Sequence, residues 1–123
     1  MAVRQRINSM RLLKLWLPVV VCCSTILYFS ILPGDRIRCF FPYQDLVFHF
    51  FVYAILGYFF IRAAEGSLSG LSQKRLVLIS VLFCFFYGGG LEFYQLYVPG
   101  RNFSGLDMLI NAAGACLGSL TYR

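Results

Sequence analysis

The feature that most constrains the fold of this chain is a set of long apolar stretches separated by short polar segments. A helix needs about 20 mostly apolar residues to cross the hydrocarbon of a bilayer. Residues 12–32, 46–64 and 76–98 have that length, and Pro-Gly dipeptides at 33–34 and 99–100 end the first and the third. Only 13% of the residues are charged, whereas a soluble domain carries about 25%. We therefore expect an integral membrane protein.

A fourth apolar stretch, residues 104–121, is the least hydrophobic of the set. Alone it would hardly enter a membrane, so we expect it to insert by packing against the other helices. The run 15–32 exceeds the core of a secretory signal peptide, which is about 7–15 residues long, and is expected to stay as a signal anchor. The predicted fold class is all-α: a polytopic membrane protein with four transmembrane helices in a small bundle. A single domain covers residues 1–123, and no internal repeat divides it.

The basic residues lie mainly on one side of this predicted bundle, eight against three. Cytoplasmic loops carry an excess of Lys and Arg. We therefore predict a multi-pass protein of the bacterial cytoplasmic membrane with both termini in the cytoplasm and loops 33–45 and 99–103 outside. The larger group is Arg4, Arg6, Arg11, Lys14, Arg62, Lys74, Arg75 and Arg123, and the smaller is Arg36, Arg38 and Arg101.

The rest of the composition bears on partners and cofactors. The net charge of +6 comes from Lys and Arg beside apolar segments and not from a basic stripe with interleaved aromatics, so the predicted partner is the bilayer and not nucleic acid. The five cysteines show no C-x-x-C pair and no His/Cys metal spacing. No disulfide, metal site or cofactor is therefore predicted, and oligomerisation stays open.

Polar side chains gather where the predicted helices meet the outer face. Ionisable residues inside a membrane segment are costly and usually mark a functional site. They recur at helical spacing along one face of each helix, so we expect them to point into the bundle. Gly114 and Gly118 continue the last of these faces and predict close approach of a neighbouring helix. The residues are Asp45 and His49, then Glu92 and Gln95, then Ser104, Asp107 and Asn111, with Arg101 in the loop before the last group.

Four of these residues are candidates for acid–base catalysis. Asp45, Glu92 and Asp107 would be crowded in a place of low dielectric, where it is costly for all three to be charged. We expect them to share protons, with His49 as a further acid or base. That is the property that general acid–base catalysis requires.

The other four are candidates for substrate binding. The planar guanidinium of Arg101 suits a phosphate or carboxylate group. The N-terminus of a helix that begins near Ser104 adds backbone N–H donors and a positive dipole end. Gln95 and Asn111 would complete a binding site for an anionic headgroup.

Each of these residues also has a purely structural interpretation. Ser104-x-x-Asp107 resembles a capping box, and Asp45 can cap the N-terminus of its helix. Gln95 and Asn111 can join neighbouring helices by hydrogen bonds. The residue types by themselves are compatible with both the functional and the structural interpretation.

Three pieces of the sequence carry a family resemblance. Asp45-x-x-x-His49 begins one helix, Glu92-x-x-Gln95 lies late in another, and the third piece is Pro99-Gly100-Arg101-x-x-Ser104-x-x-Asp107-x-x-x-Asn111-x-x-Gly114. In this order they resemble the VanZ-like family of small bacterial membrane proteins, over about residues 30–120. Relatives often have a basic residue after the first Asp, whereas this chain has Leu46. The resemblance implies a cell-envelope role of the glycopeptide-resistance type and supplies no reaction.

Two hypotheses follow. In the first, an outward-facing polar pocket binds an anionic lipid or a lipid-linked cell-wall precursor, and whether the protein also acts on it as an enzyme stays open. In the second, the protein is a non-catalytic membrane assembly factor whose polar cluster locks the bundle or docks a partner. Functional sites often sacrifice stability, so neutralising a clustered carboxylate distinguishes the two.

Overall fold

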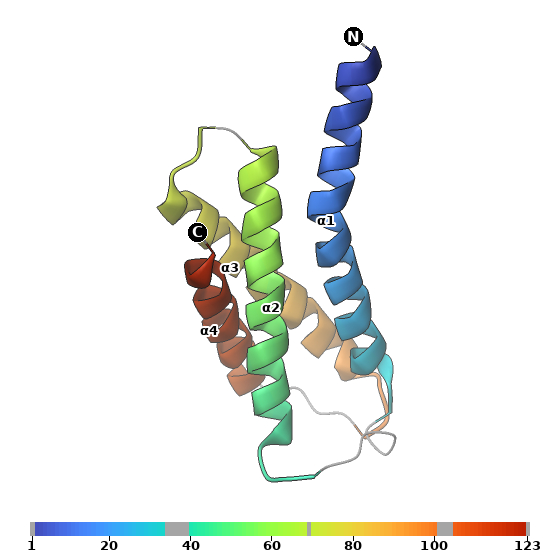
Figure 1. Cartoon of the computed structure of the whole chain (residues 1–123). Coiled ribbons are helices and arrows are strands. Elements are labelled where there is room, and N and C mark those ends of the chain that lie inside the picture. Colours follow the sequence, from blue (N-terminus) through green and yellow to red (C-terminus); the bar gives the residue numbers. More distant parts are fainter. Residues whose placement is uncertain (1, 34–39, 69, 101–104, 123) are drawn as a thin grey trace.

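The computed structural model describes residues 2–33, 40–68, 70–100 and 105–122. The predicted all-α fold is confirmed, because these residues form helices and short connections (Figure 1). The helices are α1 (Ala2–Ile31), α2 (Gln44–Ser67), α3 (Gln73–Gln95) and α4 (Gly105–Thr121).

Three of the helices are long and apolar enough to cross a membrane. The candidate spans in the described residues are Asn8–Ile31, Gln44–Ser67 and Gln73–Gln95. With 17 residues, α4 is about 26 Å long at 1.5 Å per residue, somewhat short of the roughly 30 Å hydrocarbon core. The structure thus supports a membrane protein with three apolar spans and a shorter fourth helix packed against them.

Two helix ends differ from the sequence prediction for clear local reasons. α1 begins ten residues before the predicted start at 12 and projects beyond the other helices (Figure 1). Its first turns contain Arg and Gln, which are good helix formers but too polar to count as part of a span. α3 ends at Gln95 and not at 98, because the N–H groups of residues 96–98 bond to carbonyls three residues earlier in a tight turn.

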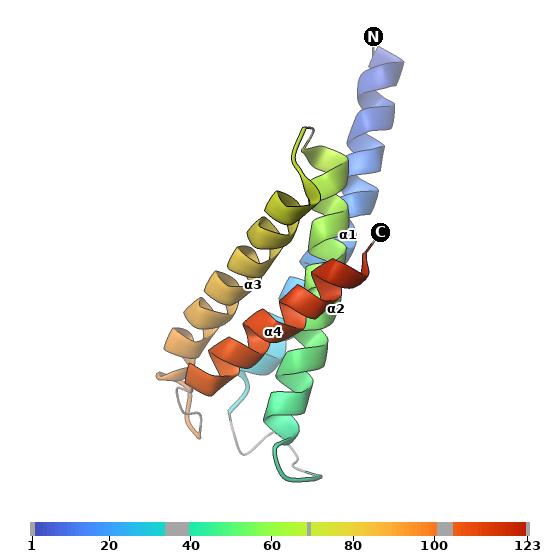
Figure 2. The same ribbon diagram turned by 90° about the vertical axis from the view of Figure 1, so that its left-hand side faces the viewer.

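α2 is the central helix of the bundle. It packs against each of the other three, and most extensively against α4, which crosses it obliquely (Figure 2). α1 and α3 end, and α2 and α4 begin, at one end of the bundle, whereas the start of α1 and the end of α4 lie toward the other (Figure 1). The first turns of α2 and α4 therefore meet the last turns of α3.

The predicted close approach at Gly114 and Gly118 is confirmed. A Cβ at Gly114 would overlap the carbonyl oxygen of Phe50, and one at Gly118 would overlap that of Ala54. Gly57 of α2 faces the backbone of α4 in the same way. Small residues at such contacts let two backbones touch, which is how helices gain packing energy inside a membrane.

Candidate functional site

Side chains from three helices converge at the end of the bundle where α2 and α4 begin. His49 comes from α2, Glu92 from the last turn of α3, and Asp107 from the first turn of α4. One ligand-type atom from each lies within 4.8 Å of the other two. Glu92 is 1% exposed. The predicted convergence is thus confirmed for these three residues, called the carboxylate–histidine trio below.

Asn111 holds the ring of His49 in one orientation. The His49 Nδ1 lies 2.8 Å from the Asn111 Oδ1, and an amide oxygen only accepts, so Nδ1 carries the proton and donates it. The other ring nitrogen, Nε2, is 3.9 Å from Oδ2 of Asp107. That distance is too long for a hydrogen bond, so Nε2 faces the carboxylate without bonding to it.

Tyr53 and Gly88 shape the space beside this hydrogen bond. The Tyr53 ring lies parallel to the His49 ring, with an interplanar angle of 4° and centroids 6.2 Å apart. A Cβ at Gly88 would be 3.1 Å from the Tyr53 hydroxyl and would overlap Nδ2 of Asn111. Sequence reasoning did not assign either residue to the site, although Tyr53 lies one helical turn after His49.

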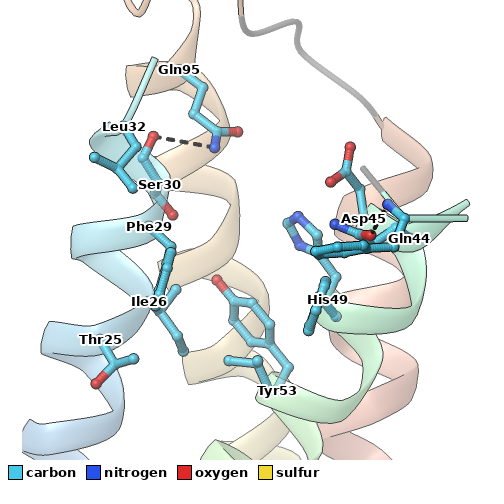
Figure 3. Close-up of a pocket in the computed structure, with 13 residues that line it drawn as sticks. Thr25, Ile26, Phe29, Ser30, Leu32, Gln44, Asp45, His49, Tyr53 and Gln95 are labelled. Atoms are coloured by element: carbon cyan, nitrogen blue, oxygen red, sulfur yellow. Dashed lines mark hydrogen bonds between the residues drawn. The ribbon is translucent and has the colours of Figure 1, made fainter. Parts of the chain in front are cut away.

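An apolar cavity of about 460 Å³ adjoins the trio, bounded mainly by α1 and α2. His49 and Tyr53 line it from α2, opposite apolar side chains of α1 such as Ile26 and Phe29 (Figure 3). His49 therefore belongs both to the polar trio and to the wall of the cavity. The hydrophobic pattern of a single helix gives no sign of such a space, because it forms between two helices.

The remaining predicted site residues lie outside the trio. Asp45 is exposed and lines the cavity near His49. Gln95 is buried and also lines the cavity, but its Nε2 donates to the carbonyl oxygen of Ser30 at 3.3 Å, which joins α3 to α1. Arg101 and Ser104 lie outside the described residues, so their predicted binding roles stay predictions.

Sequence reasoning also missed Gln44 and the metal-binding potential of the trio. Gln44 is buried at the start of α2, lines the cavity and accepts a hydrogen bond from the Phe40 N–H at 2.7 Å. The trio has the residue types of a metal site. Its members come from three helices, so the short spacings by which metal motifs are recognised could not reveal it.

Comparison with known proteins gives one match. A protein-family model described as VanZ/LLP1 matches residues 15–123, a range that contains every predicted site residue. The searches of curated proteins and of solved structures returned no match.

Proposed function

The chain belongs to the VanZ/LLP1 family, and from this we propose a function in the bacterial cell envelope. The protein binds an anionic lipid or a lipid-linked cell-wall precursor in a pocket open to the outer leaflet of the cytoplasmic membrane. Both termini are cytoplasmic, in keeping with the eight basic residues on that side. α4 enters the membrane as a fourth, shorter helix held against α2.

The observation that carries this proposal is the position of His49 between a polar trio and an apolar cavity. An amphiphile binds where a polar and an apolar environment lie in contact. Its apolar chain occupies the space between α1 and α2, and its headgroup lies against His49 at the edge of the trio. A volume of about 460 Å³ lies within the range of ligand pockets, about 300–1,000 Å³.

The proposed headgroup contacts come from both ends of the α3–α4 connection. Arg101 supplies positive charge and a planar pair of donors, and the start of α4 supplies backbone N–H groups. If the bound lipid is also transformed, by transfer or hydrolysis, His49 and one carboxylate of the trio move the proton. Asp45 at the cavity wall is the fourth acid–base candidate.

Native mass spectrometry tests the headgroup contact. The protein is released gently from its own membrane as wild type, Arg101→Gln and Arg75→Gln. Arg75 is exposed in the first turn of α3, at the other end of the bundle, so its variant removes the same charge far from the pocket. We expect a lipid of defined mass on wild type and Arg75→Gln and none on Arg101→Gln. No specific adduct on wild type would contradict the proposal.

A second pair of variants tests the apolar part of the pocket. Val52 lines the cavity, whereas Val47 is 40% exposed on the same helix and does not line it. We expect Val52→Trp to displace the lipid by filling the cavity and Val47→Trp to keep it. Equal lipid occupancy in both variants would place the bound chain elsewhere.

One observation favours the alternative function, a non-catalytic assembly role. The hydrogen bond between His49 and Asn111 joins α2 to α4 where Asn111 is buried, as expected of a polar contact that locks a helix pair. The alternative predicts that removing a charge from the trio lowers stability. The Glu92 variant considered in the Discussion measures that effect.

A further inference from the structure

We propose that the trio binds a divalent metal ion of the Zn²⁺ or Mn²⁺ class. The ligands are Nε2 of His49 and one carboxylate oxygen each from Glu92 and Asp107. Imidazole and carboxylate are common ligands of such ions. This inference stands apart from the proposed lipid function, because it needs no lipid.

The ligand geometry is close to that of a formed site. The three candidate atoms lie within 4.8 Å of one another. Ligands about 2.0–2.2 Å from one ion lie roughly 3–3.6 Å apart at tetrahedral or octahedral angles. Small rotations of the Glu92 and Asp107 side chains close that difference, while the helices that carry them stay in place.

The ring of His49 is already oriented as a metal ligand. A ligating histidine almost always donates its second ring N–H to an oxygen acceptor, which fixes the tautomer. Here Nδ1 donates to Oδ1 of Asn111 at 2.8 Å. The unprotonated Nε2 then presents its lone pair toward Oδ2 of Asp107 at 3.9 Å. A cation placed between Nε2 and Oδ2 attracts both of these electron-rich atoms.

Asn111 provides a second, independent observation. It is 1% exposed, and its Nδ2 is buried without a hydrogen-bond partner among the described residues. A buried donor without a partner costs about 1–3 kcal/mol. The side chain nevertheless places its oxygen on the His49 ring, which is the arrangement that an outer partner of a metal ligand adopts.

The trio is shielded from solvent and leaves one coordination position open. Glu92 is 1% exposed, and the side chain of Asp107 is 16% exposed. Three protein ligands leave a further position for an oxygen of water or of a phosphate group.

Metal titration of the full-length protein tests the site. The protein is purified in detergent, stripped with a chelator and titrated calorimetrically with Zn²⁺ alone. We expect one ion per chain in wild type. Loss of an outer partner of a metal ligand costs roughly 10–100-fold in affinity, and Asn111→Ala should weaken Zn²⁺ binding by that amount. His49→Gln and Glu92→Gln remove ligands themselves and should weaken binding more. Glu65→Gln, which removes an exposed carboxylate near the C-terminal end of α2 and far from the trio, should bind as wild type does.

X-ray absorption of zinc-loaded wild type keeps the test independent of how the variants fold. One nitrogen and two oxygen donors from protein are expected. The proposal is overturned if wild type takes up no ion, if the spectrum lacks a histidine donor, or if Glu65→Gln weakens binding as much as Glu92→Gln. No lipid is added in these experiments, so they test the metal site alone. The lipid adduct measurement tests the proposed function separately.

Discussion

The two ends of the α2–α4 pair are built in different ways. Between the middle of α2 and the C-terminal half of α4, the contact is backbone against backbone, with Gly118 against Ala54 and Gly57 against Ala115. Where the helices begin, the contact is between polar side chains, and His49 bonds to Asn111 across the interface. One end gains dispersion energy from close packing, whereas the other buries groups that are costly to bury. From this comparison we expect the glycine end to contribute most of the stability of the pair and the polar end to contribute less.

The largest effect is expected when α2 and α4 are separated at the glycine end, where Gly57 and Gly118 meet the backbone of the opposite helix. Gly118→Ala places a Cβ on the carbonyl oxygen of Ala54, and backbone cannot move aside as a side chain can. We expect a loss of about 3 kcal/mol, the upper end of overpacking costs, read as a lower melting temperature in detergent.

Gly90→Ala is the matched control for that change. A Cβ at Gly90 meets no atom within 4 Å, so the same substitution should stabilise α3 by about 0.5–1 kcal/mol. Equal melting temperatures for the two variants would show that the glycine end does not hold the pair.

The second prediction tests close packing at the polar end. Gly88→Ala would overlap Nδ2 of Asn111 and crowd the Tyr53 hydroxyl. We expect a loss of about 1–2 kcal/mol together with weaker Zn²⁺ binding, because Asn111 must shift away from His49. At Gly89 the nearest atom is the flexible end of Met108, 2.8 Å away, so Gly89→Ala should change both quantities little.

A smaller effect is expected from a polar contact between α2 and α4 at the glycine end. Ser119 is fully buried and donates to the carbonyl oxygen of Gly57 across 3.4 Å. Ser119→Ala should cost about 0.5–1 kcal/mol and leave lipid and Zn²⁺ binding unchanged. A loss of either ligand would show that the two ends are coupled.

The smallest stability change is expected where the functional change is largest. Glu92→Gln keeps the shape of a buried side chain and removes its charge, so the melting temperature should stay unchanged or rise. Zn²⁺ binding should be lost, because a neutral amide replaces a carboxylate ligand. A clear fall in melting temperature with Zn²⁺ binding retained would favour the assembly role and would contradict a binding role for the polar end.

Much of the fold followed from the sequence because length and periodicity act within single helices. The apolar runs predicted the membrane helices, since the hydrocarbon thickness sets a minimum length. Helical spacing placed His49, Glu92 and Asp107 on inward faces at one end of the bundle, and the structure brings these residues together. The same reasoning gave α4 as a full span, which the observed length of 17 residues does not establish.

Tertiary structure alone decided how these faces meet. Periodicity sets the face and depth of a residue on its own helix, but the rotation and offset between helices depend on packing, here on glycines that let α2 and α4 touch. That offset directs Gln95 to Ser30 and away from the trio, fixes the proton of His49 on Nδ1, and opens a cavity beside the ring. By itself, the sequence determined that polar groups gather at one end of a membrane bundle. Only the packing decided which atoms come within reach of one another, and hence what they can bind.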